Sequence, residues 1–193
     1  MANQINEKIK KIKRELYIET SAKYFETSGY ENAKMSDLAK DLEVSVGTLY
    51  KIFESKENLY FEYILYQINH FVKKLNDNAS SDPIENLKLY LQYTYEPFIE
   101  KRKSIEYTMT NDPFFFHKLN ADKEHTMDGV FDFLARQFEL IIKDDTVDHR
   151  HIAILFKKLS DGYAESYMIK EFDTTNVIDD TIDLFLNGIL KTL

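Results

Sequence analysis

A short run of side chains between residues 45 and 56 combines a bare backbone position with hydroxyl and ammonium groups. Gly47 would leave one side of a helix open, so that the backbone could approach base edges in the major groove of DNA. The hydroxyl of Thr48 can bond a base or a phosphate, and that of Tyr50 a phosphate. Lys51 and Lys56 can neutralise phosphates. This combination predicts a surface that binds nucleic acid.

Two short helical patterns must position these side chains. Apolar residues at three- and four-residue steps predict one helix over residues 36–42 and a second over 46–53. Ser45 is placed to cap the second helix and Ser55 the helix after it, since a hydroxyl there accepts an unpaired amide of the first turn. Two short helices joined by a three-residue turn form a helix-turn-helix candidate.

The rest of the chain also follows a helical pattern. A first helix is expected to end near Ser28, where Gly29 stops it, and a long helix to run from about residue 56 to 77. A further helix should start at Pro83, with breaks at Pro97 and at Asp112–Pro113. Later helices are expected over about 120–143, 148–170 and 175–193. We find no convincing strand and no internal repeat.

Residues 22–64 resemble the N-terminal DNA-binding domain of the TetR family of bacterial transcriptional regulators. The resemblance is carried by the segments Ala22-Lys-Tyr-Phe-Glu-Thr-Ser-Gly-Tyr30, Ser36-Asp-Leu-Ala39, Val44-Ser-Val-Gly-Thr-Leu-Tyr-Lys-Ile-Phe53 and Ser55-Lys-Glu-Asn-Leu59. It implies an all-α chain of about nine helices, with a three-helix helix-turn-helix domain over residues 1–54. A long helix would join this to a helical effector-binding and dimerisation domain over residues 55–193. The DNA-binding residues expected on this basis are Lys34, Ser36, Ser45, Val46, Gly47, Thr48, Tyr50, Lys51 and Lys56.

Four positions depart from the usual family pattern. Glu43 stands where the family has Gly in the turn, and a non-Gly residue with positive φ there costs about 1 kcal/mol. Lys34 replaces a capping Thr or Ser, so the second helix loses an acceptor. Val46 and Ile52 replace a basic and an aromatic or His residue. The basic stretch Lys8–Arg14 could compensate on phosphates, although a solvated helix face explains it equally well.

The second half of the chain is rich in aromatic residues around two prolines. Such rings could line an apolar effector pocket, although any one of them is more simply a core residue. The candidates are Tyr90, Tyr93, Phe98, Tyr107, Phe114, Phe138 and Tyr163. The last helix is apolar on two adjoining stripes, which predicts a homodimer through the two C-terminal helices. A helix buried on both sides within one chain is the alternative.

Charge and composition exclude several classes of protein. Residues 1–60 carry ten basic and ten acidic side chains, so the net charge of −8 lies wholly in residues 61–193. The chain has no cysteine, no metal-ligand spacing among its five histidines and no catalytic or nucleotide-binding motif. We therefore expect no cofactor, no metal and no enzymatic activity. The lack of an apolar span or signal peptide predicts a cytoplasmic protein that does not bind membranes.

These observations favour a ligand-responsive DNA-binding regulator. The resemblance indicates a repressor that leaves a palindromic double-stranded operator when a small, largely apolar or aromatic effector binds. One alternative is a small-molecule-binding protein that has lost specific operator binding, as Glu43, Val46 and Ile52 would allow. A helical enzyme that uses the C-terminal cavity is a third class, since tertiary structure can pair distant groups.

Overall fold

The computed structural model describes residues 2–100, 126–168 and 176–190, and these residues form α-helices without strands. They divide into two compact units. In the described parts, the first unit is residues 2–70 together with Thr126, and the second comprises residues 71–100, 127–168 and 176–190. The expectation of an all-α chain is confirmed, and eight helices lie within the described residues.

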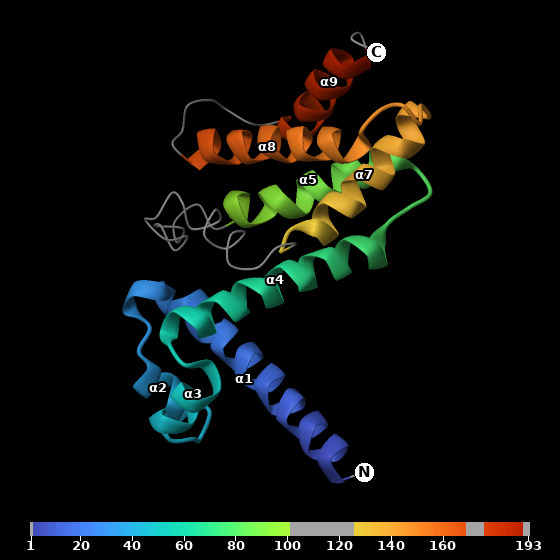
Figure 1. Ribbon diagram of the computed structural model, residues 1–193. Coiled ribbons are helices and arrows are strands. Elements are labelled where there is room, and N and C mark those ends of the chain that lie inside the picture. Colours follow the sequence, from blue (N-terminus) through green and yellow to red (C-terminus); the bar gives the residue numbers. More distant parts are fainter. Residues whose placement is uncertain (1, 101–125, 169–175, 191–193) are drawn as a thin grey trace. The chain divides into compact units, whose positions relative to one another are not determined.

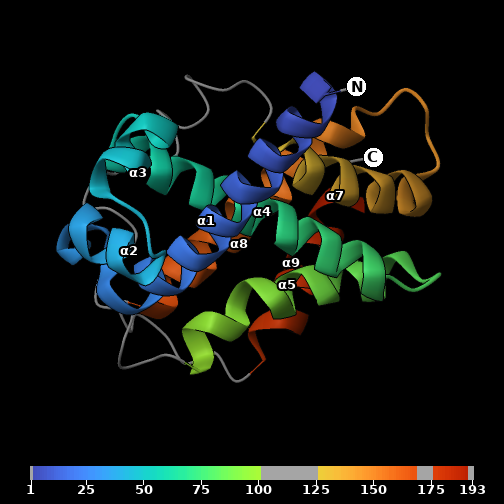
Figure 2. The same cartoon turned by 90° about the horizontal axis from the view of Figure 1, so that it is seen from below.

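The first unit contains α1 (Ala2–Asn32), α2 (Met35–Asp41), α3 (Val46–Phe53) and the N-terminal part of α4 (Lys56–Asn78). The expected helix over 46–53 has the observed bounds, and the second helix begins one residue earlier than expected. Gly29 interrupts α1 as expected, with φ of 70° and ψ of 166°. Figure 2 shows α2 and α3 near the C-terminal end of α1, whose N-terminal turns extend away from them.

An apolar core holds these helices together. Its largest fully buried side chains are Phe53, Leu38, Leu49 and Leu59, and Phe25 is also buried. The ring of Phe25 meets the edge of Tyr60, with 5.0 Å between their centroids. This core fixes α3 against α1, α2 and α4, so the exposed side of α3 has a defined orientation within the unit.

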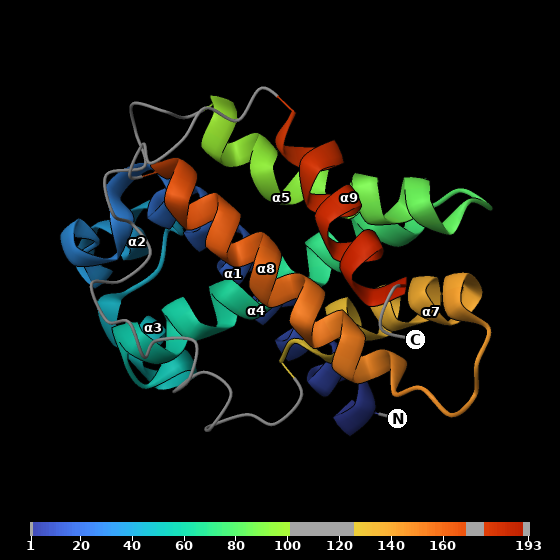
Figure 3. The same cartoon turned by 90° about the horizontal axis from the view of Figure 1, so that it is seen from above.

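The second unit contains the C-terminal part of α4 with α5 (Pro83–Glu100), α7 (Asp128–Ile142), α8 (His149–Met168) and α9 (Val177–Leu190). Helices α7 and α8 pack on each other, and α5 contacts α7, α8 and α9 (Figure 3). In Figure 1, α5 and α7 lie between the C-terminal part of α4 and α8. No helix among the described residues is long and apolar enough to cross a membrane.

Two local details set the positions of these helices. The α5 helix starts at Pro83 as expected, and the carboxylate of Asp82 caps it by accepting the amide of Ile84 at 2.8 Å. The expected break at Pro97 comes one turn later, because α5 continues to Glu100; a proline this near the end of a helix removes only one hydrogen bond from the last turn. The break at Asp112–Pro113 lies outside the described residues.

Gly129, in the first turn of α7, allows a close approach to α4. A β-carbon at this position would come within 3.2 Å of Cγ2 of Val72 and 3.3 Å of its Cγ1. Both distances are shorter than ordinary van der Waals contact. The absence of a side chain at Gly129 therefore determines how closely α7 lies against the C-terminal part of α4.

Candidate functional site

The helix-turn-helix is built by local hydrogen bonds around its two turns. The amide of Thr48 donates to the hydroxyl of Ser45 at 3.1 Å, which confirms Ser45 as the cap of α3. The amide of Asn58 donates to Ser55 at 3.1 Å in the same way at the start of α4. Lys34 offers no side-chain cap to α2, as expected; instead its own amide donates to the Tyr24 hydroxyl at 3.4 Å.

The turn before α3 and the turn after it both contain strained backbone. Glu43 has φ of 54°, so the residue that replaces the usual glycine adopts the glycine-like conformation. Glu54, which follows α3, has φ of 67° and ψ of −45°. Positive φ costs a non-glycine residue free energy in each case. The backbone is therefore strained on both sides of α3 in the orientation that this helix adopts.

Most of the expected DNA-binding residues lie on the surface of the first unit. Those that are exposed are Lys34, Ser36, Ser45, Gly47, Tyr50 and Lys51. Val46 and Thr48 are partly buried, and Val46 packs against the apolar core. The hydroxyls of Ser45 and Thr48 lie 2.8 Å apart. The structure thus gathers one continuous group, Ser45 to Lys51, on the first two turns of α3.

Gly47 is open on its outer side. A β-carbon there would meet only Oγ of Ser45, at an ordinary contact distance of 3.8 Å. Gly47 is also outside the positive-φ positions of the chain, so its backbone does not require glycine. Glycine inside a helix costs about 1 kcal/mol relative to alanine, and no contact among the described residues requires glycine at this position.

Lys56 lies apart from this group, at the junction of α1 and α4. Its ammonium is 4.4 Å from the centroid of the Tyr30 ring and donates to the carbonyl of Glu31 at 3.4 Å. The hydroxyl of Tyr30 donates to Glu57 at 2.9 Å. Burial, followed by the hydrogen bond and negative charge of Glu57, raises the pKa of Tyr30 far above its ordinary value. Lys56 therefore stabilises a junction as well as carrying charge.

Arg14 belongs to the basic stretch of α1 but has an internal role that sequence reasoning missed. Its guanidinium pairs with the carboxylate of Glu62, donates to the carbonyl of Ile52 at 2.7 Å and lies 4.7 Å from the Phe53 ring centroid. One side chain thus ties α1 to α3 and α4. No sequence signal could reveal it, because Ile52 and Glu62 lie far away in the chain. Lys8, Lys10, Lys11 and Lys13 are exposed.

The expected effector residues fall into three groups. Tyr90 and Phe138 are buried in the second unit, where both rings pack on Phe156. Tyr93 is partly buried, with the ammonium of Lys74 at 3.7 Å from its ring centroid, and Tyr163 is partly buried on α8. Phe98 is placed only as part of the α5 backbone, and Tyr107 and Phe114 lie outside the described residues.

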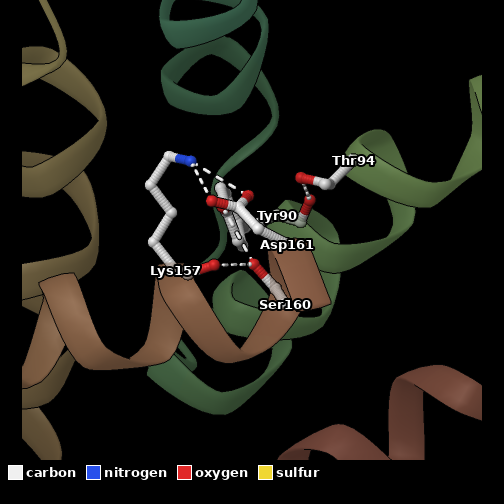
Figure 4. Close-up of polar contacts among 5 residues, drawn as sticks. All are labelled: Tyr90, Thr94, Lys157, Ser160 and Asp161. Carbon is white, nitrogen blue, oxygen red and sulfur yellow. Dashed lines mark hydrogen bonds and ion pairs between the residues drawn. The ribbon is translucent and has the colours of Figure 1, made fainter. Parts of the chain in front are cut away.

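Polar groups accompany the buried tyrosines of α5. The hydroxyl of Tyr90 lies 3.3 Å from that of Ser160, and Ser160 donates to the carbonyl of Lys157 at 2.7 Å (Figure 4). Lys157 in turn pairs with Asp161 at 2.7 Å. Further along α5, the hydroxyl of Tyr95 lies 3.5 Å from that of Thr181 on α9. Burial raises the pKa of Tyr95 to about 12, so both phenols stay neutral.

Metal binding finds little support in the part of the chain that the structure describes. There, no three His, Asp or Glu side chains are grouped so that they could hold a metal ion. Nε2 of His149 is buried without a hydrogen bond, but His149 belongs to no such group. The arrangement of greatest chemical interest is therefore the exposed start of α3.

Comparisons with known proteins agree with this geometry. The profile of bacterial regulatory proteins of the tetR family matches residues 18–63. An HTH-type transcriptional regulator of Staphylococcus aureus is 27% identical over 155 residues, which cover 70% of this chain and 83% of that protein. Both matches are to proteins described as regulators.

Solved structures show the same fold over almost the whole chain. The fatty acid degradation regulator FadR of Bacillus halodurans matches 91% of this chain and 95% of its own, with a TM-score of 0.64 and 20% identity. FadR of Bacillus subtilis, solved in complex with stearoyl-CoA, matches 89% and 97%, with a TM-score of 0.63 and 16% identity. Residues 18–63, with the capped helix-turn-helix, therefore form a DNA-binding domain of the type found in bacterial regulatory proteins of the tetR family, and the chain has the fold of such regulators.

Proposed function

We propose that this regulator is a homodimeric repressor that binds a palindromic operator through α3 and leaves it when a small, largely apolar or aromatic effector binds. The observation that carries the DNA-binding part is Gly47. Its bare position on an exposed helix serves no contact among the residues that the structure describes, whereas a DNA backbone or base edge brought against α3 would need that space. Binding of an operator against α3 would therefore explain why this position has no side chain.

A homodimer through α8 and α9 is supported by the surfaces of these two helices. Leu155 on α8 is 47% exposed and Leu184 on α9 is 56% exposed, although both are large apolar residues. Gly162 on α8 has nothing within 4 Å of the place of a β-carbon, so a helix of a second chain could approach closely there. A dimer would give two copies of α3 for the two halves of a palindrome.

The effector part rests on the aromatic and hydroxyl side chains of the second unit. Tyr93 and Tyr163 keep part of their surface open, beside the buried Tyr90 and Tyr95 with their hydroxyl partners. An apolar molecule with a polar end would match rings with hydroxyl tips. The neutral phenols and the net charge of −8 favour an uncharged or cationic effector.

Gly47→Ala tests the DNA-binding part because it separates stability from binding. We expect unfolding to require about 0.5–1 kcal/mol more free energy, since alanine favours the helix. We expect binding to a duplex from upstream of the gene, measured by fluorescence anisotropy, to weaken at least tenfold. Unchanged binding by a stabilised variant would contradict the proposal and favour a protein that has lost its operator.

Two lysines provide a matched charge control. Lys51→Ala on α3 should weaken operator binding and reduce its salt dependence by about one counterion. Lys40→Ala removes another exposed charge, from the last turn of α2 and outside the group Ser45 to Lys51, and should change binding much less. An equal effect of both would mean that binding depends on overall charge and not on α3.

The effector's action can be followed by distance measurements between the two copies of the first unit. We expect an effector to change the setting of α4 and so the separation of the two α3 helices, which must be about 34 Å on one turn of DNA. The chain has no cysteine, so Asp41→Cys offers one exposed site for a spin label. Neutral aromatic compounds, screened first by thermal shift, are the probes, with the anionic stearoyl-CoA as the contrasting ligand. A ligand that releases DNA without changing this distance would contradict the mechanism.

A further inference from the structure

The first turns of α1 carry an apolar stripe that nothing in the described chain covers. Ile5, Ile9, Ile12 and Leu16 are 58%, 47%, 63% and 55% exposed. They follow one another at steps of four, three and four residues, which places them along one side of a helix. Four large aliphatic side chains in such a row favour contact with another apolar surface.

This stripe faces away from the core of the first unit. The buried residues of α1 include Ile18 and Phe25. Ile18 follows Leu16 by only two residues, so it lies nearly on the opposite side of the helix from the stripe, and Phe25 lies on the same side as Ile18. Arg14, which contacts Glu62 and the Phe53 ring, also lies on that opposite side. The contacts that fix α1 therefore hold the stripe outward.

The spacing of the stripe matches the a and d positions of a short coiled coil. Ile9 and Leu16 take the a positions, and Ile5 and Ile12 the d positions. The flanking g positions are then Lys8 and Glu15. In an antiparallel pair of such helices, Ile9 faces Ile12 of the other copy and Lys8 comes near Glu15 of the other copy. The stripe and its flanking charges are thus self-complementary.

We propose that the N-terminal turns of α1 pair with the same turns of a second copy of this chain in antiparallel orientation. A parallel pair would instead bring Lys8 near Lys13 of the other copy, and these like charges would repel each other. Among the described residues, the ion pair of Glu15 is an exposed one with Lys11 at 4.0 Å, which costs little to exchange.

DNA is a poorer occupant of this stripe, because phosphates offer no apolar surface. Lys10 and Lys11 point away from the stripe and stay available to phosphates. Four residues make a small interface, so the pairing adds to another association of the chains and does not replace it. It requires neither operator nor effector and can fail without affecting the proposed function.

Disulfide trapping in the full chain tests the pairing and its direction. The chain has no cysteine, so single substitutions report only their own positions. Ile5→Cys and Leu16→Cys chains, one with an affinity tag, are co-expressed and oxidised. An antiparallel pair puts position 5 beside position 16 of the other copy and about 16 Å from position 5. Since a disulfide requires Cα atoms within about 7 Å, we expect only mixed dimers.

Charge exchange then tests whether the flanking residues set the direction. Lys8→Glu should reduce the yield of mixed disulfide roughly fivefold, because it places two carboxylates together. The double variant Lys8→Glu, Glu15→Lys should restore the yield, since the pair is reversed but intact. Lys10→Glu, which makes the same charge change away from the stripe, is the matched control and should leave the yield unchanged.

Three results would overturn the proposal. Disulfides between identical chains alone would indicate a parallel pair, and no disulfide at all would mean that the stripe does not meet a second copy. Binding to vesicles of anionic lipid that is lost in Ile9→Asp, without any mixed disulfide, would assign the stripe to a membrane surface instead.

Discussion

The two units of this regulator bury different kinds of side chain. In the described part of the first unit the buried residues are apolar, except for Ser21, which is polar and uncharged. The second unit buries Asn86, Gln137, Ser160 and Thr181 among its apolar residues. A general apolar core is sufficient to hold α3 in place. The second unit also depends on buried polar groups that must meet their own partners.

Each unit also contains one arginine that lies over a phenylalanine ring and pairs with carboxylates. Arg14 lies 4.7 Å from the Phe53 ring centroid and Arg150 5.5 Å from that of Phe131. Arg14 also donates to a backbone carbonyl and pairs with a mostly buried carboxylate, whereas Arg150 pairs with Asp128 and the exposed Asp132. Arg14 therefore makes contacts that are more buried than those of Arg150.

The largest effects should come from the two aromatic centres of these cores. Phe53→Ala and Phe156→Ala each remove a fully buried ring, and each should destabilise its unit by about 3–5 kcal/mol. Hydrogen exchange followed by mass spectrometry should show lost protection in residues 2–70 for the first variant and in α5, α7 and α8 for the second. Equal loss in both units would mean that they unfold together.

The buried amide pair of the second unit should have the next largest effect. Nδ2 of Asn86 donates to Oε1 of Gln137 at 2.9 Å and to the carbonyl of Ser80 at 2.9 Å. Asn86→Ala leaves these acceptors without their donor in the interior and should cost about 1–3 kcal/mol in urea unfolding. Asn76→Ala, which removes an exposed amide, is the matched control. A cost below that of the control would contradict a specific polar interior.

The arginine pair tests the comparison directly. Arg14→Ala should cost about 1–2 kcal/mol, because it removes a charge-assisted bond to a carbonyl and the contact with Phe53. Arg150→Ala should cost less, about 0.5–1 kcal/mol, since an ion pair near solvent contributes little. Both values come from chemical denaturation of the single variants. The reverse order would show that the exposed ion pairs of Arg150 contribute more to the free energy of unfolding than the buried contacts of Arg14.

Backbone strain should give the smallest effects, and these have the opposite sign. Glu43 in the first unit and Lys143 in the second both have positive φ, 54° and 52°. Glu43→Gly and Lys143→Gly should therefore each stabilise the protein by about 0.5–1 kcal/mol. Glu139→Gly, inside α7, should destabilise by a similar amount and serves as the control. Thermal unfolding measures all three, and a lower midpoint for Glu43→Gly would mean that its side chain has a stabilising contact.

The sequence was sufficient for the parts of the fold that depend on neighbouring residues. The bounds of α3, the caps Ser45, Ser55 and Asp82, and the interruption at Gly29 all follow from positions within a few residues of one another. The match to a family profile over residues 18–63 has the same origin, because this region encodes its shape locally. The exposure of most of the expected DNA-binding side chains follows from that shape.

Features that join distant residues could not be predicted. Arg14 meets a carbonyl and a carboxylate that come from α3 and α4, and Asn86 meets Gln137 from another helix. The spacing of apolar residues from Ile5 to Phe25 predicts one continuous helix. However, the two-residue step after Leu16 places the residues before it and after it on opposite faces of that helix. The spacing alone did not show which of these faces is buried. Tyr90 and Phe138, candidates for an effector pocket, lie in the core, and their role with an effector stays a prediction.

The close contact between Gly129 and Val72 has a mechanical consequence for α4. Because a backbone pressed against a branched side chain resists sliding, the contact can act as a fulcrum on which the helix tilts. Val72 lies about 9 Å along the axis from Asn78 and about 24 Å from Lys56. Tilting about this point would turn a movement of 1 Å at the Asn78 end into one of about 2.7 Å at Lys56, so α4 would work as a lever whose long arm is its N-terminal part.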